Sequence, residues 1–342
     1  MSRAFIDLAK EGAFNLARNC AEARSGDKVT LVNERGRVEE DAVDLIVEAV
    51  TSQGARCDVL WVERGPDGLM LSKSEMDTVL NADKVIASTG DMAPFADLIH
   101  AEQIGLVVKN HLYNYQLLGT ELGRYHWGMA SAIVTRLEEL FAQGKRWRVT
   151  TVSGTDISGK IGDVSVRARY VDEERPPAMR STSTLRYRSV ASTDAEGRVV
   201  VPFASGLSRI PSDEPAVLVV ENNQVMAVEG SRGENLETEE LRQGVDDLVA
   251  RFGEPGRVVD SFHGGGHPTA EFRSGSVGNA CSRVMHFHIG RTTGRGGDYL
   301  NPEIADHTFE LDGQVIFRDG KLAFLANDPV IQAAAERFDV SV

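Results

Sequence analysis

Apolar residues follow helix and strand periods in alternation along the first part of the chain. Over residues 4–24 they fall on one face of a helix, at Phe5, Leu8, Ala9, Ala13, Leu16 and Ala17. The segment KVTLVNE then has the composition of a strand, EEDAVDLIVEAVTSQG that of an amphipathic helix ending at Gly54, and ARCDVLWVE that of a second strand. Strand, helix and strand joined by short turns predict a parallel βαβ unit.

The same alternation continues to about residue 145. Helical patterns occur in SKSEMDTVLNA, FADLIHAEQIG and TELGRYHWGMASAIVTRLEELFAQG, and short apolar strands occur in KVIAST and LVVKN. The sequence therefore predicts that residues 1–145 form one open α/β domain with a mostly parallel sheet. No G-x-G-x-x-G follows its first strand, so the pattern gives no dinucleotide-binding fingerprint.

The pattern changes after residue 145, where apolar and polar residues alternate in short runs. Such runs include KRWRVTT, GRVVVPF, PAVLVVENN and QVMAVEG, and NNQ and Asp319-Gly320 have the composition of hairpin turns. One helix, ETEELRQGVDDLVARFG, interrupts them. Residues 146–342 are therefore expected to form a β-rich α+β domain with mainly antiparallel strands, and this domain holds the candidate metal site.

Composition narrows the classes of function. The 342 residues are 42% hydrophobic and 26% charged, which is typical of a soluble globular protein. A net charge of −14 disfavours nucleic acid as a partner, and no apolar run approaches the ~18 residues that span a bilayer, so no membrane partner is expected either. Three distant cysteines and an N-terminus without a signal peptide indicate the cytoplasm, with a small molecule as the expected substrate.

Five of the eight histidines lie between residues 263 and 307. His286 and His288 form an H-x-H in the apolar run VMHFHI, and alternate residues of a strand share one face. That spacing suits two metal ligands, and it equally suits one ligand beside a packed or hydrogen-bonded histidine.

His307 lies among carboxylates, namely Glu303, Asp306, Glu310 and Asp312. A helical turn would align Glu303 with His307. Two imidazoles and one carboxylate are the facial ligand set of non-haem Fe(II) oxygenases, and they also suit a hydrolytic Zn or Mn site. The alternative is that these carboxylates are solvated and that His307 caps a turn.

Two further segments offer substrate-binding groups. His263 and His267 flank three glycines, which predicts either a substrate loop or a flexible turn. Arg291 and Arg295 lie in a glycine-rich segment, where they would clamp a carboxylate or stand exposed. The absence of a G-x-S-x-G elbow disfavours a serine nucleophile, and three histidines are interpreted as structural: His100, His111 and His126.

The order of WRVTTVSGTDISGKIG, GRVVVPF, VLVVENNQVMAVEG, HIGRTTG and VIFRDGKLAFLAND resembles that of the thermophilic-type metallo-aminopeptidases (aminopeptidase T-like). It also resembles their relative, 2,5-dihydroxypyridine 5,6-dioxygenase. The resemblance covers most of the chain by order of segments. It implies an α/β first domain, a metal site in the second domain and a homodimer.

Departures from the aminopeptidase and dioxygenase motifs disfavour a two-metal aminopeptidase site. The aminopeptidases hold two metals with a Glu where Arg198 stands here and a second Glu where His288 stands, and arginine does not ligate metals. The dioxygenase relatives hold one Fe(II) with a His before Ile-Gly and a final H-x-D. His288 matches the first of these, whereas His307 is followed by Thr308 and Phe309, so the third ligand stays open.

The site expected from residues and resemblance has three groups of residues. The predicted metal ligands are His288, His307 and Glu303, with His286, Asp306 or Asp312 as alternatives for the third. The predicted proton-transfer groups are His286 and His267, and the predicted substrate-binding groups are Arg291, Arg295 and His263.

The predicted function is that of a mononuclear non-haem Fe(II) oxygenase acting on a small polar aromatic or N-heterocyclic compound. The alternative is an aminopeptidase or amidohydrolase that uses a water bound to Zn, Mn or Co. A third reading is a metal- or ligand-binding protein built on the same scaffold, with every coordination position filled by protein groups.

Overall fold

The computed structural model describes residues 3–66, 68–100, 103–164, 179–182, 186–202, 213–230, 236–272, 279–290 and 299–341. Contacts divide the chain into two units. Unit 1 comprises Met1–Ala132, Ala168–Leu185 and Arg337–Val340, and unit 2 comprises Ile133–Arg167, Arg186–Glu336 and Ser341–Val342. The division falls inside helix α7 (Trp127–Gln143), ahead of the domain boundary expected after residue 145.

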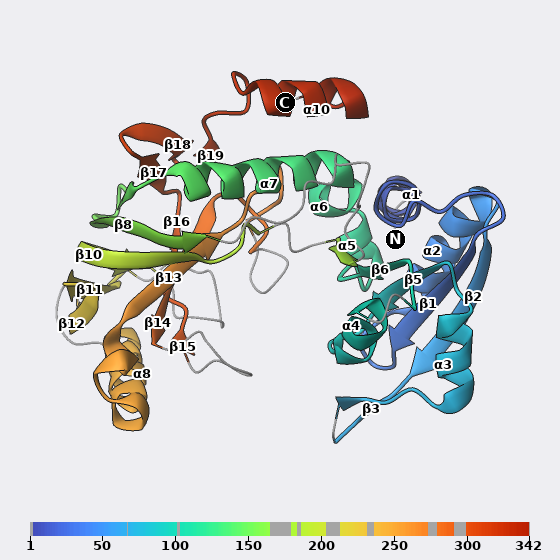
Figure 1. Ribbon diagram of the computed structural model, residues 1–342, viewed down its shortest axis with the longest axis horizontal. Helices are drawn as coiled ribbons and strands as arrows, with labels where there is room; N and C mark the ends of the chain where they lie inside the picture. The colour runs from blue at the N-terminus through green and yellow to red at the C-terminus, as the bar shows by residue number, and fades with distance from the viewer. Residues whose placement is uncertain are drawn as a thin grey trace. The chain divides into compact units, whose positions relative to one another are not determined.

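Unit 1 is built on a five-stranded sheet in the order β2-β1-β5-β6-β9, and each neighbouring pair is parallel (Figure 1). Its strands are β1 (Lys28–Glu34), β2 (Arg56–Val62), β5 (Lys84–Ser88), β6 (Leu106–Lys109) and β9 (Met179–Ser181). The prediction of an open α/β domain with a parallel sheet is confirmed. The edge strand β9 was not anticipated, because it comes from beyond residue 145 and has three residues.

Strand order explains how helices cover this sheet. The chain passes from β1 to β2 on one side and then from β2 to β5 on the other side of β1. Right-handed crossovers place α2 on one face and α3 and α4 on the other. The helical segments of unit 1 are α1 (Arg3–Asn15), the π-helix Leu16–Cys20, α2 (Glu40–Ser52), α3 (Lys73–Leu80), α4 (Ala93–His100), α5 (Tyr115–Leu118) and α6 (Glu121–Arg124), and a small hairpin joins β3 (Arg64–Gly65) to β4 (Gly68–Leu69).

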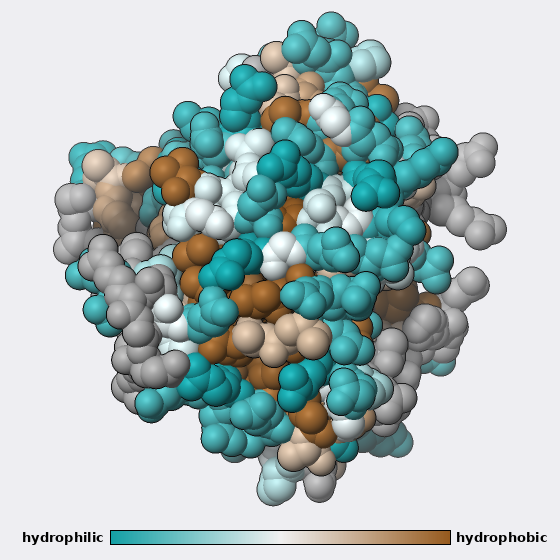
Figure 2. All heavy atoms as spheres, turned by 90° about the vertical axis from the view of Figure 1, so that its left-hand side faces the viewer, coloured by the Kyte–Doolittle hydropathy of each residue, from teal (hydrophilic) through white to brown (hydrophobic). Residues whose placement is uncertain are grey.

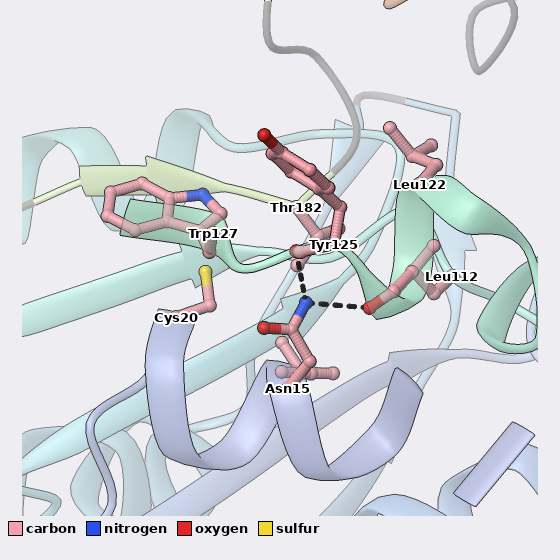
Figure 3. Close-up of a pocket in the computed structure, with 9 residues that line it drawn as sticks. Asn15, Cys20, Leu112, Leu122, Tyr125, Trp127 and Thr182 are labelled. Atoms are coloured by element: carbon pink, nitrogen blue, oxygen red, sulfur yellow. Dashed lines mark hydrogen bonds between the residues drawn. The ribbon is translucent and has the colours of Figure 1, made fainter. Parts of the chain in front are cut away.

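A small cavity lies in unit 1 beside the π-helix (Figure 3). Asn15 closes one wall by donating through Nδ2 to the carbonyls of Gly123 and Tyr125, at 2.7 and 2.8 Å. The room inside is about 10 Å³, which suffices for a single water molecule. The cavity is therefore a packing feature of unit 1 and too small for an organic substrate.

Unit 2 is built on a large antiparallel sheet in the order β15-β14-β13-β10-β8-β7-β17-β18-β19. Strand β11 extends it from β10, β12 pairs with β11, and β16 pairs with β14. The strands are β7 (Arg146–Thr150), β8 (Asp156–Val164), β10 (Val190–Val201), β11 (Ala216–Glu221), β12 (Gln224–Gly230), β13 (Val259–Gly264), β14 (Val284–Gly290), β15 (Tyr299–Leu300), β16 (Glu303–Ala305), β17 (Thr308–Leu311), β18 (Gln314–Arg318) and β19 (Lys321–Leu322). The predicted β-rich α+β domain is confirmed.

One face of this sheet carries an aromatic core beneath α7. The Phe141 ring of α7 lies 6.0 Å from Phe262 and 5.4 Å from Phe309. Trp147 of β7 lies 5.2 Å from Phe262, between ring centroids. These side chains are fully buried, so they fix which face of β13 points inward. The other helices of unit 2 are α8 (Leu236–Phe252), the 3₁₀ segment Glu254–Arg257 and α10 (Pro329–Phe338) (Figure 1).

The surface is mostly hydrophilic on the side shown in Figure 2, with an apolar area near its centre. Unit 2 also exposes single large apolar side chains, at Val152, Met226 and Tyr299. Among the helices within the described residues, none is both long and apolar enough to span a membrane.

Candidate metal centre

Strands β13 and β14 bring histidines from two parts of the sequence together. They pair antiparallel, with His263 opposite His286 and Ser261 opposite His288. Directly opposed residues of an antiparallel pair share a face, and so do alternate residues of one strand. All four side chains therefore lie on one face of the sheet.

Apolar residues on the other face hold this arrangement. Phe262 and Phe287 alternate with the histidines and pack against Trp147, at centroid distances of 5.2 and 6.1 Å. A slip of one residue in the register would turn the phenylalanines out of the core and the histidines into it. The aromatic core thus determines where the histidines point.

Three imidazoles form a compact group. The candidate ligand nitrogens of His263, His286 and His288 all lie within 4.8 Å of one another. His286 and His288 are 2% and 3% exposed, and His263 is half-buried. Nitrogens around a tetrahedral Zn²⁺ lie about 3.4 Å apart, given Zn–N distances of about 2.0–2.1 Å.

The hydrogen bonds of His288 leave one nitrogen available. Nδ1 lies 2.8 Å from the Ser261 hydroxyl, which in turn donates to the Asp260 carboxylate at 3.5 Å. The Ser261 hydroxyl therefore accepts a hydrogen bond from Nδ1–H of His288, and Nε2 of that ring carries the lone pair. That Nε2 is buried and makes no hydrogen bond with any residue that the structure describes. An outer-shell oxygen on one ring nitrogen and a lone pair on the other are typical of metal-binding histidines.

His263 has the same tautomer with a different partner. Its Nε2 lies 3.1 Å from Nη1 of Arg186, and its Nδ1 lies 3.3 Å from the Ser189 hydroxyl. A guanidinium only donates, so Nε2 accepts and Nδ1 carries the proton. Sequence reasoning missed Arg186, because nothing in TLRYRSV distinguishes it from an ordinary strand arginine.

Burial keeps His263 and His288 neutral near pH 7. It lowers the pKa of His288 to about 4, an effect that Asp260 partly opposes. Burial, His286 and the Arg186 guanidinium hold the pKa of His263 far below its usual range. These two imidazoles are therefore uncharged nitrogen donors, the form that binds metal ions.

The donor set fits a divalent transition metal. Imidazole suits Zn, Cu, Fe and Ni, and three protein nitrogens leave coordination positions open. Among the described residues, the group of three contains no carboxylate. Glu303 of β16 lies directly opposite His286 of β14, so the two residues share one face of the sheet. Glu303 was one of the predicted ligands, and this strand register places it near the three histidines.

The structure does not bring His307 to this group. Ala305 lies opposite Val284, so His307 lies beyond the start of β14, while His288 lies near its end. The separation between Val284 and His288 alone is about 13 Å at about 3.3 Å per residue. The His307 ring instead lies 5.0 Å from Phe317, in the aromatic core.

Other predicted site residues have contacts of their own. Asp306 forms a two-pronged ion pair with Arg283, at 2.6 and 2.7 Å. Asp312 accepts from the backbone N–H groups of residues 145 and 146. His267 is fully buried and accepts through Nδ1 from the N–H groups of residues 269 and 270, which fits a structural role in that loop. Arg291 and Arg295 lie outside the described residues.

Comparison with known proteins supports the fold. The sequence matches no protein-family model and no curated protein significantly. Among solved structures, it is similar to 2,5-dihydroxypyridine dioxygenase from Pseudomonas putida KT2440, with a TM-score of 0.63 and 13% identity over 94% of this chain and 98% of that one. It is also similar to AmpT from Thermus thermophilus, with a TM-score of 0.50 and 15% identity over 93% of this chain and 100% of that one. The predicted resemblance to these two kinds of protein is confirmed at the level of the fold.

Replacing Ser261 tests the assigned tautomer. We expect Ser261→Ala to weaken metal binding about 10–100-fold, because His288 loses the oxygen that orients its ring. Equilibrium dialysis with Zn²⁺ would measure the change. Ser153 is exposed, so Ser153→Ala is the matched control and should bind Zn²⁺ as tightly as the wild type. Equal affinity in both variants would show that Ser261 does not orient a ligand.

Acid should destabilise unit 2 partly through His307. Burial lowers the pKa of His307 from 6.5 to about 4. Between these pH values the unfolded chain therefore binds a proton at this residue and the folded chain does not. The contribution of neutral His307 to the free energy of unfolding is fully present above pH 6.5. It is lost as the pH falls toward 4, which lowers the free energy of unfolding by up to about 3 kcal/mol. Urea unfolding between pH 4 and 7.5 should show a shallower pH dependence for His307→Leu. An unchanged slope would contradict the assignment.

Proposed function

We propose that this chain is a mononuclear metal-dependent dioxygenase acting on a small polar aromatic or N-heterocyclic compound, with Fe(II) as its metal. The observation that carries the proposal is the convergence of His263, His286 and His288 on one face of the β13–β14 pair. The likeness in fold to a 2,5-dihydroxypyridine dioxygenase supports the reaction class. In this proposal the three histidines replace the predicted set that included His307.

Each group near the site has a distinct role in this proposal. Ser261 and Ser189 hold the protons of two imidazoles on Nδ1, so each of these rings carries its lone pair on Nε2. Fe(II) bound there would supply open positions for the substrate oxygens and for O₂. Glu303 lies on the same face, where its carboxylate could complete the ligand set or take the proton of a substrate hydroxyl.

Ring cleavage balances without a further cofactor. One carbon–carbon bond of the substrate breaks, and both atoms of O₂ enter the product. The four electrons that O₂ accepts come from the substrate, so no external reductant is needed. The protein has to bind the substrate, orient it and accept one proton.

The alternative is a metal-dependent aminopeptidase or amidohydrolase that uses Zn, Mn or Co, as the likeness in fold to AmpT suggests. Its two-metal form is not supported at Arg198, which stands where those enzymes place a glutamate. That side chain is 53% exposed and pairs with Glu229 at 2.7 Å, as a surface ion pair.

A homodimer in the cytoplasm is also proposed. The resemblance in sequence order suggested the dimer, and three free cysteines agree with a reducing compartment. Light scattering of the purified chain should give about twice the mass of 37.2 kDa. A mass equal to one chain at micromolar concentration would contradict the dimer.

Metal analysis tests the site with two matched variants. The wild type, reconstituted with Fe(II) without oxygen, should hold about one ion per chain. We expect His288→Ala to lower metal affinity by more than about 100-fold, a larger loss than replacing a hydrogen-bond partner of a ligand causes. His307→Leu should keep the metal affinity of the wild type. Loss of metal in His307→Leu together with retention in His288→Ala would reinstate the ligands predicted from the sequence.

Activity then separates the two reaction classes. The Fe(II) form should consume O₂ with 2,5-dihydroxypyridine or a related ring diol, and His288→Ala should not. Hydrolysis of peptide amides by the Zn, Mn or Co form, without O₂ consumption by the Fe(II) form, would favour the alternative.

A further inference from the structure

Two arginine side chains of unit 1 converge at the edge of the parallel sheet where β1 and β5 end. Glu34, the last residue of β1, is buried, and its carboxylate oxygens lie 3.2 Å from Nε of Arg37 and 3.7 Å from Nε of Arg64. The same carboxylate accepts at 2.6 Å from the N–H of Gly90, two residues beyond the end of β5. The segments that follow three adjacent strands, β2, β1 and β5, therefore supply these groups.

Glycine at position 90 lets both guanidinium groups approach the backbone closely. A Cβ atom at this position would lie 2.5 Å from an Nη atom of Arg37 and 3.0 Å from an Nη atom of Arg64. Even an alanine would therefore displace the ends of the two arginines. Arg37 is also restrained by the Tyr113 ring, since its Cζ lies 5.4 Å from the ring centroid. The two guanidinium groups are thus held side by side over Gly90.

The donors of this arginine pair exceed what the nearby carboxylates accept. A guanidinium donates through all of its nitrogens and accepts nothing. Arg64 is too far from Glu34 for a hydrogen bond, and its side chain makes none with any residue that the structure describes. Its side chain is 46% exposed and that of Arg37 is 36% exposed, so a dissolved ligand can reach both.

The charges at this edge of the sheet are nearly balanced, although the whole chain carries −14. The second carboxylate is Asp91, which accepts from two backbone N–H groups and feels the positive charges of Arg64 and Lys109. Three cationic side chains therefore stand near two carboxylates. An anion is not repelled here, and the outward N–H groups of the two guanidinium groups can donate to it.

The place of the arginine pair in the fold also favours a ligand. The chain leaves β1 toward β2 on one side and later enters β5 on the other side, so the strand order reverses between β1 and β5. In open parallel sheets, ligands bind outside the carboxyl ends of the strands at such a point. Arg37, Arg64 and Gly90 all follow carboxyl ends of strands at this point.

We infer that Arg37 and Arg64 form a second ligand site, in unit 1, which binds the phosphate group of a small molecule. A phosphate has enough oxygens to accept from two guanidinium groups at once, whereas one guanidinium already matches the two oxygens of a carboxylate. The site is built from residues of unit 1 and does not depend on the histidine group, which lies in unit 2.

Titration calorimetry of the full-length protein with inorganic phosphate at low ionic strength tests the site. We expect Arg64→Gln to weaken phosphate binding at least about tenfold, as for the loss of one charge-assisted hydrogen bond, and Arg64→Lys to restore part of it. Gly90→Ala should also weaken binding, because it moves both arginines, and should keep the circular dichroism spectrum of the wild type.

Arg35→Gln is the matched control. Arg35 lies on the same segment after β1, but its side chain lies over the Trp61 ring and pairs with Glu63 at 4.0 Å. This variant should bind phosphate as tightly as the wild type. Equal weakening in Arg35→Gln and Arg64→Gln would show attraction by surface charge alone and overturn the site.

Two further results would also contradict the inference. A wild-type chain that binds no phosphate at millimolar concentration would overturn the site. Tighter binding of malonate than of phosphate, lost in Arg64→Gln, would overturn the assignment to phosphate in favour of carboxylates. Arg64→Gln should keep the metal affinity of the wild type, so failure of this site and failure of the proposed function are separate outcomes.

Discussion

The two-residue period of β14 is the constraint on which the site depends. In VMHFHIG every residue is buried, so both faces of the strand must be satisfied. Phe287 enters the aromatic core that α7 and β7 build, and His286 and His288 consequently take the opposite face. The free energy gained by burying the aromatic rings thus offsets the cost of burying the polar imidazoles of His286 and His288 on the opposite face.

Pairing with β13 turns a strand of two histidines into a three-imidazole group. The register places His263 and Ser261 opposite the two histidines of β14, so one strand supplies both a third nitrogen and a hydroxyl that fixes a tautomer. Because His263 and His288 are neutral, their attraction for a cation comes from lone pairs and not from charge. The guanidinium of Arg186 adds a positive charge in contact with His263.

Sequence patterns predicted much of the fold because each element carries a strong local period. The parallel sheet of unit 1, the antiparallel strands of unit 2 and the shared face of His286 and His288 all follow from spacing along a single segment. The helical alignment of Glu303 with His307 was wrong, since residues 303–305 form β16 and Asp306 has a positive φ of 51° that breaks the strand before His307. A short polar segment has no period long enough to distinguish a turn of helix from a strand.

The sequence by itself determined the class of fold, the histidine-rich chemistry of one region, and the departures from a two-metal pattern, because composition and period are properties of the chain. Tertiary structure decided which histidines meet. His263 joins His286 through strand register, whereas His307 is carried to the far end of β14 and into the core. Arg186 lies outside the named strands, and an isolated bridge to Gly265 holds its backbone beside the end of β13. Register between distant segments depends on packing of the whole sheet, so no local pattern in the sequence could specify these contacts.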